Sequence, residues 1–390
     1  MCKGFMNTYR QEKLKKFAAD KLALTGLCMV IFLLFIAISA PFIANGRPLL
    51  VCTAEKGFFM PFLRSFFAPD SSEFIIEQLF NYILIYLVFF LITLALPKKI
   101  NPVKKIIRIA GAVSLLMPFI FTQKKIDKTD YRELYLNKEK VIAVFAPIPY
   151  GPYEQCAAPY EKPSKTHILG TDDIGRSVAS RLVYGARISL AVGILATALS
   201  LIIGCTVGMV TGYFKGITDL VSMRIIEVLN CFPTFLLLLI LMAMLKDYKF
   251  EQSILIIIGV LGLTSWIGLA LLVRGETLKQ SSLAYILSCK AMGLPLRRTL
   301  FVHLLPNISG VIFISFTFGV AGAILAESSL SFLGFGVQAP TASWGGLLRQ
   351  SFEDPLHYWH LTFFPGMALF IAVCGFNFMG EGLRKALSER

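Results

Sequence analysis

The residues best placed to do chemistry lie in a basic stretch between two long apolar segments, residues 285–307, which read YILSCKAMGLPLRRTLFVHLLPN. Lys290, Arg297, Arg298 and His303 make this stretch too polar to remain in lipid. Its residue pattern is also too regular for a flexible linker. We therefore predict a surface that another protein grips on the basic side of a membrane.

The same stretch predicts two short helices that meet at a bend. Residues 283–292 form the first helix, and Gly293 can adopt the left-handed conformation that ends it. Pro295 suits the first turn of a second helix, which runs to Pro306. We expect Leu283, Ile286 and Leu287 to make an apolar side, and the small Ser288 and Cys289 to let a partner approach. The residues alone slightly favour an ordinary interfacial loop anchored by Lys and Arg.

Catalytic motifs are absent from the sequence. It has no GxxxxGK[ST] phosphate loop, no HExxH and no GxSxG, and its four His are scattered. The eight Cys show no ligand spacing, so we expect no enzyme activity, no metal site and no cofactor. Cys52 and Cys156 are the two Cys that we place outside the membrane; a disulfide between them is conceivable, but free thiols are favoured.

Several ionisable residues near apolar segments allow two interpretations. Arg224 and Glu227, three residues apart, either form an ion pair within a helix, which we favour, or belong to a transport pathway or gate. Glu327 either holds the following Ser-Ser turn, which we favour, or lines a vestibule. Asp172, Asp173 and Arg176 fit a capped turn better than a metal site.

Composition makes the chain an all-α integral membrane protein. It has 390 residues, 56% of them hydrophobic and 16% charged, with a mean hydropathy of +0.68. The net charge of +14 does not indicate nucleic-acid binding, because the basic residues flank apolar spans. We expect about eight transmembrane helices, near residues 22–44, 77–96, 106–122, 187–212, 224–245, 253–273, 308–330 and 362–381.

The distribution of Lys and Arg predicts that both termini and residues 285–307 are cytoplasmic, since short basic loops stay inside. The first span is an uncleaved anchor rather than a signal peptide. Gly204, Gly208 and Gly212 share one helix face and predict a helix-packing seam. The predicted organisation is a basic tail (1–21), an anchor helix (22–44), an insertion with two extra spans (45–125), a Pro-rich external loop (126–186) and a five-helix core (187–386) that contains the loop 283–307.

Residues 285–307 resemble the EAA loop of ABC-importer permeases, with Leu287, Ser288 and Cys289 at the Glu-Ala-Ala positions, Gly293 at the Gly and Leu305–Pro306 at the end. The family's acid is missing at Leu287. Longer similar blocks are residues 21–44, 167–190, 223–233, 324–348 and 364–387. Together they resemble the C-type permease subunit of oligopeptide, dipeptide or nickel ABC importers, from which residues 45–165 depart as an insertion.

The resemblance implies a type I permease bundle in the bacterial cytoplasmic membrane that moves oligopeptides or dipeptides. Its partners would be a homologous second permease, two ATP-binding cassette subunits that hydrolyse the ATP, an extracytoplasmic substrate-binding protein and membrane lipid. Nickel or another small solute, an ion-coupled secondary carrier and an assembly factor without a transport path remain alternatives. The residues implied in ATPase coupling are Leu287, Ser288, Cys289, Lys290, Ala291, Gly293, Arg297, Arg298, Leu305 and Pro306.

Overall fold

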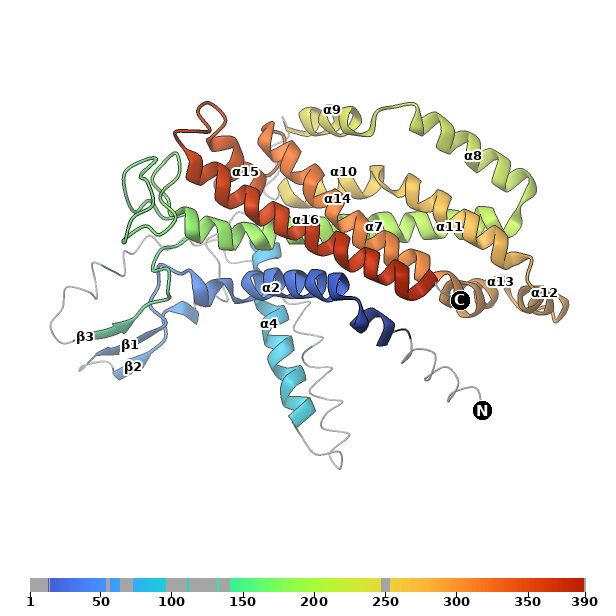
Figure 1. Cartoon of the computed structure of the whole chain (residues 1–390), viewed down its shortest axis with the longest axis horizontal. Coiled ribbons are helices and arrows are strands. Elements are labelled where there is room, and N and C mark those ends of the chain that lie inside the picture. The colour runs from blue at the N-terminus through green and yellow to red at the C-terminus, as the bar shows by residue number, and fades with distance from the viewer. Residues whose placement is uncertain are drawn as a thin grey trace.

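The computed structural model describes residues 13, 15–53, 57–63, 73–95, 111, 132, 141–246 and 253–388. Most of these residues are helical (Figure 1). The helices are α2 (Lys21–Ile43), α4 (Phe74–Ala95), α7 (Val178–Phe214), α8 (Gly216–Asn230), α9 (Thr234–Lys246), α10 (Ser253–Thr264), α11 (Trp266–Ser281), α12 (Ala284–Ala291), α13 (Leu296–Arg298), a π-helical turn (Thr299–Leu304), α14 (Leu305–Phe332), α15 (Trp344–Gln350) and α16 (Trp359–Ser388).

The long helices lie side by side in an elongated bundle (Figure 1). At one end are α12 and α13; we call residues 283–307 the elbow, and this end the elbow end. At the other end, the loop end, lie residues 141–177 and the segment around α15. Lys385 Nζ lies 3.1 Å from Asp20 Oδ2, so the start of α2 and the end of α16 meet. Both helices therefore have these ends toward the elbow end.

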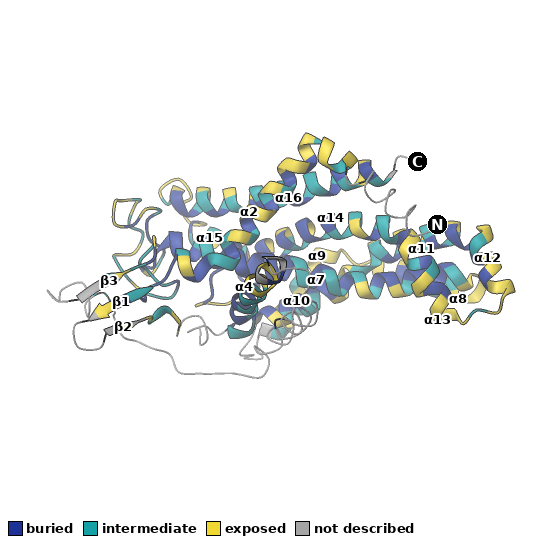
Figure 2. Cartoon of the chain, turned by 90° about the horizontal axis from the view of Figure 1, so that it is seen from below, coloured by how far each residue is buried: buried dark blue, intermediate teal, exposed yellow. Residues whose placement is uncertain are grey.

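The number of candidate membrane spans in the described residues is five, or up to seven if two bent helix pairs each count as one span. The predicted span 106–122 lies, apart from residue 111, outside the described residues. The predicted span 77–96 is present as α4, which leads away from the bundle and is seen nearly end-on in Figure 2. Its first turns pack against the bundle, whereas its later apolar side chains, from Leu87 to Leu91, are exposed.

Two of the predicted straight spans are bent. The span predicted at 224–245 is α8 and α9, which meet at 74°. Pro233 lies in the break, where it lacks a backbone donor and restricts the residue before it. The span predicted at 253–273 is α10 and α11, bent by 40° at Ser265. The sequence pattern gave the length of each span but not the change of direction.

The glycine seam predicted on α7 is present and packs against α11. A Cβ atom on Gly208 would lie 2.6 Å from the carbonyl oxygen of Ala270, and one on Gly212 would lie 2.8 Å from that of Arg274. Real Cβ atoms do not approach backbone so closely, so only glycine lets these helices come together. The packing interpretation of this face is confirmed.

The loop end carries a small sheet that the sequence did not indicate. Its strands are β1 (Leu50–Thr53), β2 (Gly57–Phe59) and β3 (Val141–Val144), in the order β2-β1-β3 with both pairs antiparallel. Cys52 in β1 and Cys156, in the loop between β3 and α7, are free, which agrees with the favoured prediction. The Cys156 thiol donates to the carbonyl of Gly175 at 3.4 Å, and burial raises its pKa.

Candidate functional site

The elbow begins with α12, which ends as predicted at Gly293. Gly293 has a φ of +66°, in the left-handed region. The N–H of Gly293 donates to the carbonyl of Lys290 at 3.0 Å, and the N–H of Leu294 donates to that of Cys289 at 3.1 Å. These two bonds satisfy carbonyls that the end of a helix leaves free. Pro295 then stands at the N-cap of α13.

The second helix of the elbow does not stop at Pro306, contrary to the prediction. Helical structure runs from Leu296 to Phe332 without interruption. Pro306 is the second residue of α14 and directly follows the π-helical turn Thr299–Leu304. A π turn is wider than an α turn and gives room for a ring that would otherwise meet the preceding turn. The second half of the elbow, from Leu296 onward, is therefore one continuous helix with α14, whereas residues 292–295 separate α12 from it.

The helix α12 has an inward face and an exposed face, and the prediction assigned three residues to the wrong one. Ile286 and Cys289, three positions apart, are buried; Cys289 is only 4% exposed. Of the expected apolar side only Ile286 is buried, because Leu287 is 52% exposed and Leu283 is exposed as well. Cys289 was expected to face a partner, but it is buried. Ile286 packs in a cluster with Met209, Val273, Leu300, Leu304 and Ile308.

The surface that a partner could contact is formed by exposed residues on α12 and after it. Figure 2 shows this end of the molecule with much exposed surface. Lys290 Nζ lies 4.4 Å from the centroid of the Tyr213 ring, whereas Arg297 and Arg298 make no ion pair within the described residues. The exposed residues of this surface are Ala284, Leu287, Ser288, Lys290, Ala291, Met292, Gly293, Pro295, Leu296, Arg297 and Arg298.

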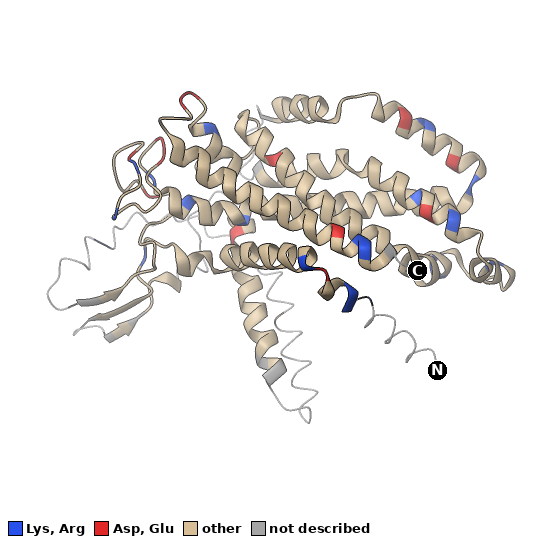
Figure 3. Ribbon diagram, viewed as in Figure 1, with Lys and Arg blue, Asp and Glu red and all other residues tan. Residues whose placement is uncertain are grey.

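The predicted pair of Arg224 and Glu227 is present on α8. Arg224 Nη1 lies 2.5 Å from Glu227 Oε2, and the two side chains are 72% and 50% exposed. Sequence reasoning missed a second pair, in which Arg274 on α11 contacts both carboxylate oxygens of Asp219 on α8, with Nη2 2.7 Å from Oδ2. These residues are 55 positions apart, so no local spacing could have paired them. Figure 3 shows charged residues of α8 and α11 toward the elbow end of the bundle.

Glu327 is fully buried, and the structure supports its structural role. Its carboxylate accepts hydrogen bonds from the hydroxyls of Ser331 at 2.7 Å, Ser189 at 3.1 Å and Ser328 at 3.3 Å. Ser189 belongs to α7, so Glu327 joins α7 to α14. Of the predicted Ser-Ser pair only Ser328 contacts Glu327; Ser329 donates to the carbonyl of Leu325, and Ser331 is the second partner on α14.

Arg187 on α7 is a buried cation that sequence reasoning did not single out. Its Nε donates to the carbonyl of Ala37 at 2.6 Å, and its two Nη atoms donate to those of Ile38 at 3.2 Å and Glu77 at 3.3 Å. It thus joins α7, α2 and α4. The three carbonyls lie more than a hundred residues away along the chain, so no motif marks them.

The turn predicted at Asp172 is present just before α7. Asp172 Oδ1 accepts from the backbone N–H groups of Ile174 at 3.1 Å and Arg176 at 2.8 Å. Its Oδ2 lies 2.6 Å from Arg176 Nε and 3.2 Å from Arg181 Nε. No group of three or more metal-ligating side chains lies together in the described residues.

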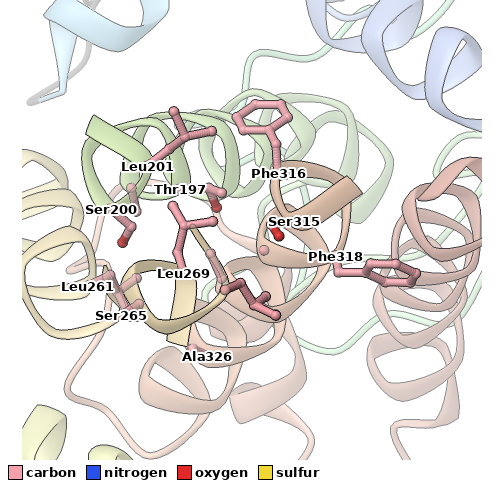
Figure 4. A pocket seen from close by; sticks show the side chains of 15 residues that line it. Thr197, Ser200, Leu201, Leu261, Ser265, Leu269, Ser315, Phe316, Phe318 and Ala326 are labelled. Atoms are coloured by element: carbon pink, nitrogen blue, oxygen red, sulfur yellow. The ribbon is translucent and has the colours of Figure 1, made fainter. Parts of the chain in front are cut away.

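A cavity of about 360 Å³ lies among α7, α10, α11 and α14 (Figure 4). Two of its lining residues, Ser200 and Gly319, are near the middle of α7 and α14. Neither Glu327 nor the Arg224–Glu227 pair lines it. Its lining residues are Ala196, Thr197, Ser200, Leu201, Leu261, Ser265, Leu269, Leu272, Ser315, Phe316, Phe318, Gly319, Gly322, Ala323 and Ala326.

Known proteins match most of the helical bundle. Residues 182–390 match the family described as binding-protein-dependent transport system inner membrane component. Residues 8–49 match the N-terminal TM domain of oligopeptide transport permease C. Residues 50–181 lie between the two matches.

Curated relatives extend this likeness. The dipeptide transport system permease protein DppC of Bacillus subtilis is 41% identical over 230 residues, 58% of this chain and 70% of the relative. The oligopeptide transport system permease protein OppC of the same organism is 37% identical over 254 residues, 64% of this chain and 81% of the relative. The glutathione transport system permease protein GsiD of Pectobacterium atrosepticum is 37% identical over 230 residues, 59% of this chain and 75% of the relative.

The family match covers more than half of the chain, and the bundle has the apolar helices that a multi-pass inner-membrane protein requires. The chain therefore belongs to the family of binding-protein-dependent transport system inner membrane components.

Proposed function

We propose that this chain is the membrane-spanning permease subunit of an ATP-driven importer that moves oligopeptides or dipeptides across the cytoplasmic membrane. Separate ATPase subunits bind the elbow and supply the energy. An extracytoplasmic binding protein delivers the substrate at the loop end, and a homologous second permease completes the transport path. The relatives named for dipeptide, oligopeptide and glutathione transport support a peptide substrate.

The observation that carries this proposal is the continuity of the elbow with α14. Exposed residues of the elbow, Leu296 and Arg297, begin a helix that extends without a break to Phe332. The same helix lines the cavity with Gly319 and Gly322. A partner that moves the second half of the elbow, residues 296–307, therefore moves one wall of the cavity as a rigid body, which is the mechanical link that alternating access needs.

Charge and geometry support a cytoplasmic elbow and cytoplasmic termini. The tail before α2 and the segment 274–303 are rich in Lys and Arg, which short cytoplasmic segments retain. The contact between Asp20 and Lys385 places the start of α2 beside the end of α16 at the elbow end. A single orientation in the membrane therefore places the N-terminal tail, residues 274–303 and the end of α16 on the same side.

The exposed apolar face of α8 and α9 supports a second membrane subunit. Ile217 is 82% exposed, and large apolar side chains continue to be exposed along both helices. A second permease would cover this apolar face. The exposed apolar residues of α8 and α9 include Leu220, Val221, Ile225, Val228, Leu236, Ile240 and Met244.

A matched pair of serine variants tests the coupling role. Ser288 in the elbow and Ser329 at the loop end of α14 are both exposed, and each hydroxyl donates to the carbonyl four residues before it at 2.8 Å. We expect Ser288→Trp to abolish peptide uptake and substrate-stimulated ATPase activity, because the indole obstructs the docking surface. Ser329→Trp should leave the ATPase subunits bound to the complex.

Both variants would be compared at equal membrane levels, with uptake measured in cells and ATP hydrolysis in the purified complex. Normal coupling in Ser288→Trp would contradict the role of the elbow. The uptake panel would contain dipeptides, oligopeptides and Ni²⁺. Ni²⁺ uptake without peptide uptake would replace the peptide substrate by a small solute but leave the coupling mechanism intact.

A further inference from the structure

The cavity among α7, α10, α11 and α14 has an unusual polar lining. Three of its hydroxyls, those of Thr197, Ser265 and Ser315, make no hydrogen bond to any described residue. The fourth hydroxyl, of Ser200, donates to the carbonyl of Gly262 at 2.9 Å. Figure 4 shows the four residues around the cavity, on α7, α14 and the break between α10 and α11. Three unpaired hydroxyls therefore line one space.

Five other hydroxyls of α7, α10 and α14 do not behave in this way, although Thr277 on α11, outside the cavity, is also buried without a partner. Thr206 and Thr211 on α7, Thr264 on α10, and Thr317 and Ser329 on α14 each donate to a carbonyl three or four residues earlier. A polar group without a partner is costly inside a membrane, and this local bond is the usual way to satisfy it. The cavity hydroxyls are thus available to a ligand or to water.

The rest of the lining is apolar and carries no charge. None of the described lining residues is Asp, Glu, Lys, Arg or His. Leu261, Leu269 and Phe316 supply apolar walls, and on α14 a Cβ atom at Gly322 would meet no atom within 4 Å. A site with hydroxyls and apolar walls suits a neutral polar group beside an apolar one, and it gives a charged group no counter-ion.

We propose that this cavity is a substrate subsite on the transport path that binds an uncharged part of a peptide. The hydroxyls of Thr197, Ser265 and Ser315 exchange hydrogen bonds with backbone amides, and the apolar walls take a neutral side chain. The inference rests on the proposed function and adds the place and the chemistry of contact. The cavity volume of about 360 Å³ is at the small end for ligand sites, which fits one or two residues rather than a whole oligopeptide.

The position of the cavity agrees with this role. It lies near the middle of α7 and α14, and it is bordered by Ser265, where α10 and α11 meet at 40°. Because α14 continues from the second half of the elbow, movement of residues 296–307 would change the width of the cavity. Binding and release at this subsite would therefore respond to the ATPase cycle.

The first test fills the cavity without disturbing the fold. A Cβ atom added to Gly322 meets no atom within 4 Å, and leucine favours a helix over glycine. We expect Gly322→Leu to lower peptide uptake roughly tenfold, since the new side chain occupies space that the substrate needs. Gly366→Leu on α16 is the matched control, because its Cβ also meets no atom within 4 Å and it does not line the cavity.

The second test changes the charge of the cavity. With Ser265→Asp, uptake of a lysine-containing dipeptide relative to a glutamate-containing one should rise roughly tenfold, because the carboxylate attracts one and repels the other across a site of low polarity. Ser329→Asp, outside the cavity, should leave the ratio unchanged. A merely structural role of Ser265 would not alter selectivity by charge.

The outcomes separate this inference from the proposed function. If Gly322→Leu transports peptides as the wild type does, or if Ser265→Asp transports with an unchanged ratio, the subsite is wrong although the importer remains. If the wild-type complex takes up no peptide at all, the proposed function and the subsite fall together. Loss of uptake in Gly322→Leu with retained ATPase binding, and the shifted ratio in Ser265→Asp, would support the subsite.

Discussion

The two ends of the helical bundle are built differently. At the loop end, buried polar side chains are bonded across helices: Arg187 binds carbonyls of α2 and α4, and Glu327 binds a hydroxyl of α7. At the elbow end, α12 buries only Ile286 and Cys289 and exposes most of its other residues. The contrast indicates that the loop end fixes the bundle, while the elbow end is shaped for contact with another protein.

The difference also predicts what mutations will do. Buried polar groups are costly to leave unpaired, so changes at the loop end should affect stability. Exposed elbow residues touch little within the chain, so changes there should affect coupling and leave stability nearly unchanged. The three predictions below test this division in order of decreasing effect.

The largest effect is expected from Arg187→Met. The variant removes three guanidinium hydrogen bonds, to the carbonyls of Ala37, Ile38 and Glu77, and Ala37 has no helical donor to replace it because Pro41 lacks an N–H. We expect the free energy of unfolding to fall by about 3 kcal/mol, roughly 1 kcal/mol per carbonyl. Thermal unfolding in detergent measures it. Arg297→Met, an exposed arginine of the elbow, is the control and should unfold at the wild-type temperature; equal losses in the two variants would remove the contrast between the ends.

A smaller loss is expected in the seam that joins the two ends. Gly208→Leu places a side chain where the carbonyl of Ala270 lies, so α7 and α11 must separate. Overpacking of this kind costs about 2 kcal/mol. The control is Gly259→Leu, because a Cβ atom there meets no atom within 4 Å. Thermal unfolding in detergent measures this loss too. A Gly208→Leu variant as stable as its control would show that α7 and α11 can separate without loss of stability.

The smallest effects concern the two ion pairs of α8. Asp219→Asn breaks a partly buried, two-pronged contact with Arg274 and should cost about 1 kcal/mol. Glu227→Gln breaks an exposed pair with Arg224 and should cost about 0.3 kcal/mol. Double-mutant cycles give the two coupling energies. A stronger coupling in the exposed pair would mean that α8 is not fastened to α11 through Asp219.

Local features of the sequence predicted much of the architecture. Gly293 marks the end of α12, the spacing of Gly204, Gly208 and Gly212 marks the seam, and the Ser residues after Glu327 mark its partners. Each of these signals lies within a few residues of the feature that it determines, or repeats along one helix face. Such features can be predicted because they depend on residues that are close together in the sequence or on one face of a helix.

The features that the sequence did not predict depend on contacts between residues far apart in the chain, or on the direction in which a helix runs. The bond of Arg187 to Ala37 spans 150 residues, and the pair of Asp219 and Arg274 spans 55. Hydropathy gives a span its length, but it does not show that α4 leads out of the bundle or that the π turn carries the helix through Pro306. The cavity is likewise formed by residues from four helices, so no single segment carries its pattern.

Photo-crosslinking from the elbow tests the central claim most directly. A photoreactive amino acid at position 291, which is exposed on α12, would be activated in native membranes, with position 329 at the loop end as the control. The account predicts that position 291 forms an adduct with an ATP-binding subunit and that position 329 does not. An adduct of position 291 with an extracytoplasmic binding protein, or ATPase adducts from position 329 alone, would contradict it.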